Sequence, residues 1–236
     1  MTVDADVGAF SGVVESQPRP AIIRPAERPR DQCPPNPKPV TTEVLFDNRP
    51  VVFSSAKSSA QLGQMKTSTV FSHGPNEVFV TGGITSSNIS SQVELATATL
   101  TWKGEDLACL YPAGVKVTVT YAPEVYIASG YAPSSCRYQS TMQHELRHVN
   151  TDIITLKEFI PWVEERMKAQ IAAIPLPRPQ GAAARSGAEQ QMMAGIQAAL
   201  ADAMNTMNSA RMARQQMIDT RQEYLRMSKA CPQEKL

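Results

Sequence analysis

The stretch Ser140-Thr-Met-Gln-His-Glu-Leu-Arg-His-Val-Asn150 marks the point at which the sequence changes its periodicity. Before it, from about residue 42 to 130, apolar and polar residues alternate with a period of two, which predicts strands with one buried face. From this stretch as far as Met167, apolar residues recur at every third or fourth position, which predicts an amphipathic helix. We therefore expect an α+β fold in which an antiparallel β-sheet packs on this helix.

The same stretch contains the pattern His-Glu-x-x-His at His144, Glu145 and His148, in a chain with only three histidines. Residues four apart on an α-helix share one face, about 6 Å apart along the axis. Two imidazoles in that arrangement can bind one Zn²⁺ ion. Glu145 is then placed to act as a general base on a water molecule at the metal. The motif predicts two zinc ligands and one catalytic carboxylate, and the alternative is a solvated, charged helix surface without a metal.

The third protein ligand stays open, because no histidine follows His148. An acidic ligand is favoured. Asp152 lies one turn further along the same helix face, where it would either support His148 from behind or reach the metal. A second helix starting at Pro161 would offer acidic residues of its own. The candidates are Asp152, Glu164, Glu165 and His73.

The segment Cys136–His148 and the preceding strand Val115–Tyr121 resemble the zincin metallopeptidases. Among these, the segment is similar to uncharacterised bacterial families described as secreted zinc-dependent proteases, in which a β-sheet with a cysteine precedes the metal-binding helix. The resemblance implies a zinc peptidase acting on peptide or protein substrates, with the ligands and catalytic glutamate named above. Such sites take an extended peptide alongside a sheet edge, and we expect this edge at Tyr121–Tyr126 because Pro123 disfavours strand pairing.

Two other functions remain as alternatives. One is a non-catalytic zincin-like module with a structural or assembly role in the bacterial envelope. The other is a metal-dependent amide hydrolase acting on peptidoglycan, which would use the same metal chemistry.

The distribution of proline and of helical periodicity predicts four segments. Eight of the 18 prolines lie between Pro18 and Pro39, which predicts a disordered or polyproline-like tail. The C-terminal region is rich in Ala, Gln, Arg and Met, and predicts a helical arm that packs on its own domain or on a second copy of the chain. The segments are a Pro-rich tail at 1–41, a sheet-plus-helix domain at 42–174, a linker at 175–187, and a long helix or helical hairpin at 188–230.

Charge and hydrophobicity exclude two classes of partner. Lys and Arg total 23 against 22 Asp and Glu, a net charge of +1, which argues against nucleic-acid binding through a basic surface. No stretch approaches 18 consecutive apolar residues, so we expect no transmembrane segment.

The four cysteines form no Cys-x-x-Cys pair, which favours two disulfides over a cysteine zinc site. We expect Cys109–Cys136 as one of them, because both residues flank the same β-rich region. Disulfides indicate a periplasmic or secreted protein. The first residues lack the features of a signal peptide, so export would imply that the signal has been removed, and a cytoplasmic location is the alternative.

Overall fold

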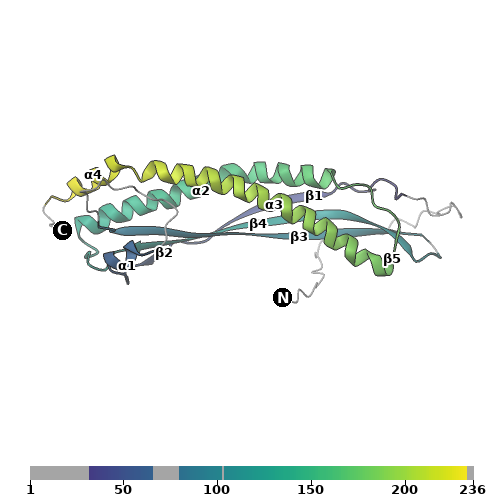
Figure 1. The fold of residues 1–236 in the computed structure, drawn as a ribbon, viewed down its shortest axis with the longest axis horizontal. Coiled ribbons are helices and arrows are strands. Elements are labelled where there is room, and N and C mark those ends of the chain that lie inside the picture. Colours follow the sequence, from purple (N-terminus) through teal and green to yellow (C-terminus); the bar gives the residue numbers. More distant parts are fainter. Residues whose placement is uncertain (1–31, 66–79, 103, 233–236) are drawn as a thin grey trace, which may run out of the picture.

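The computed structural model describes residues 32–65, 80–102 and 104–232. These residues form an elongated molecule in which two long helices lie along one face of a long sheet (Figure 1). The elements in chain order are β1 (Thr41–Asn48), β2 (Val52–Ser54), α1 (Ser59–Gly63), β3 (Gly83–Thr101), β4 (Leu107–Ile127), α2 (Cys136–Ala172), β5 (Gln180–Gly181), α3 (Ala182–Ile218) and α4 (Arg221–Ala230).

The sheet is mixed, with β4 at its centre. β3 and β4 form a long antiparallel hairpin, whereas β1 and β2 both pair with β4 in parallel. The prediction of an antiparallel sheet is therefore wrong for β1 and β2. An alternating pattern defines the buried face of a strand but not its direction. A strand that follows a tight turn has to be antiparallel to its neighbour, while β1 is separated from β4 by the whole of β3 and is free to run parallel to it.

β4 is an internal strand, so the expected substrate-binding edge at Tyr121–Tyr126 is also wrong. β1 pairs with residues 114–121 of β4, and β2 pairs with residues 124–126 along the same edge of β4. Pro123, which has no N–H to donate, falls in the gap between these two pairings. Proline is therefore accommodated at a break in the partner strand, and β3 lies on the opposite side of β4.

The helix predicted after residue 140 is one uninterrupted helix, α2. It begins after Ser135, whose hydroxyl accepts a hydrogen bond from the Tyr138 N–H at 3.1 Å. The helix continues through Pro161, so no second helix begins there. Its buried face packs against the sheet and against α3 in one core that includes Val117, Val119, Tyr121, Leu156, Val163, Met167, Ile196, Leu200 and Met207.

The C-terminal region forms two helices. α3 begins at Ala182, inside the segment predicted as a linker, and runs antiparallel alongside α2 (Figure 1). It ends at Ile218 with Asp219 as its C-terminal cap, and α4 then lies beside the start of α2 (Figure 1). Within the described residues, no helix has the length and hydrophobicity needed to cross a membrane.

Two disulfides close the structure, Cys33–Cys109 and Cys136–Cys231. The predicted Cys109–Cys136 pairing is wrong, because the two residues lie towards opposite ends of β4. A strand rises about 3.3 Å per residue, so Cys109 and the end of the strand at Ile127 are roughly 60 Å apart. Two disulfides are typical of proteins from oxidising compartments.

The Pro-rich tail predicted at 1–41 lies mostly outside the described residues. Its last part is attached to the domain, since Cys33 is buried in its disulfide and the Tyr111 hydroxyl donates to the Pro34 carbonyl at 2.7 Å. This attachment holds the chain against the start of β4, at the far end of the molecule from α4.

Candidate metal centre

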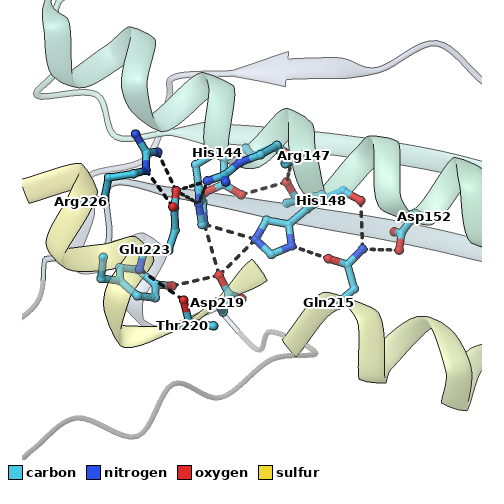
Figure 2. Close-up of polar contacts among 12 residues, drawn as sticks. His144, Arg147, His148, Asp152, Gln215, Asp219, Thr220, Glu223 and Arg226 are labelled. Atoms are coloured by element: carbon cyan, nitrogen blue, oxygen red, sulfur yellow. Dashed lines mark hydrogen bonds and ion pairs between the residues drawn. The ribbon is translucent and has the colours of Figure 1, made fainter. Parts of the chain in front are cut away.

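The two histidines of the motif project from α2 towards the junction between α3 and α4 (Figure 2). His144 and His148 lie one turn apart, and their Nε2 atoms are 3.2 Å from each other. Their exposed fractions are 3% and 7%. The alternative of two solvated histidines on a helix surface is therefore wrong.

Asp219 completes the cluster from the C-terminal cap of α3. Its Oδ1 lies 3.2 Å from Nε2 of His144 and 3.1 Å from Nε2 of His148. These three atoms form a nearly equilateral triangle. Tetrahedral ligands at 2.0–2.1 Å from zinc are separated by about 3.3 Å, so the triangle has the size of one face of a zinc tetrahedron. The three residues could hold a metal ion, and a tetrahedral ion would retain one further coordination position.

Among the described residues, none of those considered as a third ligand takes the place that Asp219 has in the cluster. Glu164 and Glu165 both pair with Lys168, at 2.7 Å and 2.8 Å, on the exposed side of α2. His73 lies outside the described residues. Asp152 is 1% exposed and lies behind His148, where it accepts hydrogen bonds from other buried groups. Asp152 supports His148 indirectly, because it contacts the Gln215 side chain, which in turn contacts His148.

The cluster is the end of a longer contact between α2 and α3. On each helix, three polar residues follow one another at a spacing of four, and because the helices are antiparallel the two rows face each other in reverse order. The facing pairs are Asp152 with Arg211, His148 with Gln215, and His144 with Asp219. Polar residues at every fourth position, Arg211, Gln215 and Asp219, were therefore a sequence signal for the third ligand. The sequence does not say, however, which helix these residues face.

The Glu145 side chain points towards the first residues of β3. The Thr85 hydroxyl lies 2.8 Å from a carboxylate oxygen of Glu145 and 3.0 Å from its backbone carbonyl. At Gly83, a Cβ atom would lie 2.8 Å from the same carboxylate group and 2.6 Å from the Thr141 side chain. Only glycine allows β3 to approach the helix this closely.

The protonation properties of the site follow from burial and charge. Burial raises the pKa of Glu145, and the nearby imidazoles and the Thr85 hydroxyl offset part of this rise. Burial, the largest single effect, would lower the pKa of His148, but the hydrogen bonds of Asp219 and Gln215 and the charges of Asp219 and Glu145 together outweigh it and raise the pKa. Glu145 is thus a buried carboxyl group, coupled to the histidines, that can hold or release a proton.

α4 covers the outer side of the cluster. The Tyr224 hydroxyl donates to Oδ1 of Asp219 at 3.2 Å, and burial together with the Asp219 charge raises the pKa of Tyr224. A carboxylate oxygen of Glu223 lies 3.4 Å from Nδ1 of His144 and forms an ion pair with Arg147, whose guanidinium is 3.0 Å from the same ring nitrogen. The Cys136–Cys231 disulfide attaches the end of α4 to the first residue of α2.

No protein-family model, curated protein or solved structure shows a significant match to this chain.

Proposed function

We propose that the chain is a zinc-dependent peptidase whose metal is held by His144, His148 and Asp219. The observation that carries the proposal is the triangle of ligand atoms, with edges of 3.1 to 3.2 Å, on the helix that also presents Glu145. Zinc in such a site acidifies a coordinated water molecule and polarises a carbonyl group. Two nitrogen ligands and one carboxylate, with one position free, are the ligand set of several hydrolytic zinc sites.

Glu145 is the proton-transfer group in this proposal. It accepts the proton of the attacking water and delivers it to the departing amine. Its burial and its contact with Thr85 keep the carboxyl group in one orientation during both transfers. The roles proposed from the sequence for His144, His148 and Glu145 are retained, and Asp219 is added as the third ligand.

β3 is the strand best placed to bind a peptide substrate. Among the described strands it pairs only with β4, so its other edge has no partner there. Thr85 and Gly83, at the start of this strand, are in contact with Glu145 or adjacent to it. An extended peptide added to this edge would run past the catalytic carboxylate.

α4 covers the proposed metal ligands and therefore limits the access of a substrate to them. The side chain of each of the three ligands is less than 10% exposed, so a substrate reaches the site only when α4 moves away. The same burial favours a second candidate function, a structural zinc site that joins α2 to the α3–α4 junction in a non-catalytic module. The two disulfides support location in the periplasm or outside the cell for either function.

The variant Glu145→Gln separates the two functions. We expect it to bind one zinc per chain, as the unchanged protein does, and to lose hydrolysis of fluorescent casein by a factor of about 100 or more. Glu165→Gln, on the exposed side of the same helix, is the control and should retain full activity. Each protein is assayed with the Cys136–Cys231 disulfide intact and with Cys231→Ser. Zinc binding without hydrolysis in all forms would leave the structural zinc site as the function.

A further inference from the structure

A chain of hydrogen bonds lies behind His148, on the side of the ring opposite the metal cluster (Figure 2). Nδ1 of His148 contacts Oε1 of Gln215. The amide nitrogen of Gln215 contacts Oδ1 of Asp152 and donates to the backbone carbonyl of His148 at 2.9 Å. Nε of Arg211 donates to the same Asp152 oxygen at 2.8 Å.

The chemistry of these groups allows one orientation of the Gln215 amide. The His148 carbonyl and the Asp152 carboxylate are both acceptors, so the NH₂ end of Gln215 has to face them. Its oxygen, which can only accept, then faces Nδ1 of His148. Nδ1 must therefore carry a hydrogen. When zinc is bound, the lone pair of the ring is left on Nε2, the atom that points at Asp219 and His144.

Asp152 is itself held in place by groups from three elements. It is 1% exposed, and its Oδ2 accepts from the Tyr121 hydroxyl of β4 at 3.2 Å. Arg211 from α3 also donates to the Ser87 hydroxyl of β3 at 2.8 Å. The position of Gln215 is thus set by the sheet and by both long helices rather than by a single flexible side chain.

Stabilisation of the α2–α3 contact does not explain this polar row. A buried ion pair such as Arg211–Asp152 gives little net stability, because removing both charges from water offsets their attraction. One helical turn further from the metal, the same contact between the helices is made by buried apolar residues, Leu156 and Met207. Within the described residues, the buried charged and amide side chains of this contact are those of His144, His148, Asp152, Arg211 and Gln215. Its other ion pairs, Arg166–Asp202 and Arg214–Glu158, lie at the surface.

We propose that Gln215 is a positioning residue that fixes His148 with its hydrogen on Nδ1, so that Nε2 binds the metal. Asp152 and Arg211 fix Gln215 in turn. The inference rests on the metal site of the proposed function, but it concerns metal binding and not hydrolysis.

The test compares Gln215→Met with Gln216→Met, an exposed neighbour on the same helix. Zinc affinity is measured by competition with a chromophoric chelator, on full-length protein with both disulfides intact. We expect Gln215→Met to bind zinc about 10- to 100-fold more weakly and Gln216→Met to bind as the unchanged protein does. Nitrogen-15 spectra of the imidazoles in the zinc-loaded protein identify the ligating atom. His148 should ligate through Nε2 and show a slowly exchanging Nδ1–H, and this signal should broaden or shift in Gln215→Met.

Unchanged zinc affinity and an unchanged His148 signal in Gln215→Met would overturn the inference. So would ligation through Nδ1 in the unchanged protein, and that spectrum decides the matter even if Gln215→Met fails to fold. Absence of zinc binding by the unchanged protein would overturn both this inference and the proposed function. Zinc binding with an Nδ1–H signal but no hydrolysis would overturn only the proposed function.

Discussion

Oδ1 of Asp219 lies 3.1 Å from Nε2 of His148, although 71 residues separate them in the chain. The contact exists because α3 runs antiparallel to α2 and ends beside the motif. Asp219 is the first residue beyond the last turn of α3, so its position depends on where that helix stops. The candidate metal centre is thus assembled by the packing of two helices.

Replacing Asp219 by alanine should remove the proposed third ligand. We expect the zinc dissociation constant to rise by on the order of 100-fold or more, as determined by chelator competition. Asp202→Ala is the matched control, because Asp202 lies on the same helix and pairs with Arg166 on the surface at 3.2 Å. Equal zinc affinity in both variants would show that Asp219 is not a ligand.

Removing the metal should lower the stability of the protein. A ligand that binds only the folded state adds about 2.7 kcal/mol when its free concentration is 100 times its dissociation constant. For a chain of this size, that corresponds to a loss of about 5 to 10 °C in melting temperature when zinc is chelated. Scanning calorimetry with zinc and with EDTA measures the difference. His148→Ala should show no such difference, and a difference of the same size in that variant would place the stabilising metal elsewhere.

Adding a methyl group at Gly83 should disturb the Glu145 carboxylate, the proposed general base. A Cβ atom there would lie 2.6 Å from Cγ2 of Thr141 and 2.8 Å from Oε1 of Glu145, so one of these groups has to move. We expect Gly83→Ala to lose about 1 to 3 kcal/mol in denaturant unfolding, and casein hydrolysis to fall with it. At Gly130 a Cβ atom would meet nothing within 4 Å, so Gly130→Ala is the control. Equal effects at the two glycines would contradict the close approach of β3 to α2.

Local patterns in the sequence predicted the elements of this fold, while contacts between distant elements decided the rest. The spacing of His144 and His148 is a property of one helix, so their convergence follows from the sequence alone. Strand direction, the partner of Cys109 and the position of Asp219 depend on how separate elements pack. For example, residues 211 to 219 carry polar side chains at every fourth position, but only the antiparallel packing of α3 on α2 brings them to the histidines.

The Cys136–Cys231 disulfide should control access to the candidate metal centre, because it attaches α4 over the three proposed ligands. With both cysteines replaced by serine, we expect α4 to detach more often and EDTA to extract zinc at least about 10-fold faster. The matched control replaces Cys33 and Cys109. This disulfide joins positions that are 76 residues apart in the sequence, and Cys136–Cys231 joins positions that are 95 apart. The chain-entropy model gives both disulfides similar stabilisation, about 4 to 5 kcal/mol as an upper estimate. The two double variants should therefore lose comparable stability, while only the loss of Cys136–Cys231 speeds zinc extraction. Equal extraction rates would show that α4 does not limit access to the site.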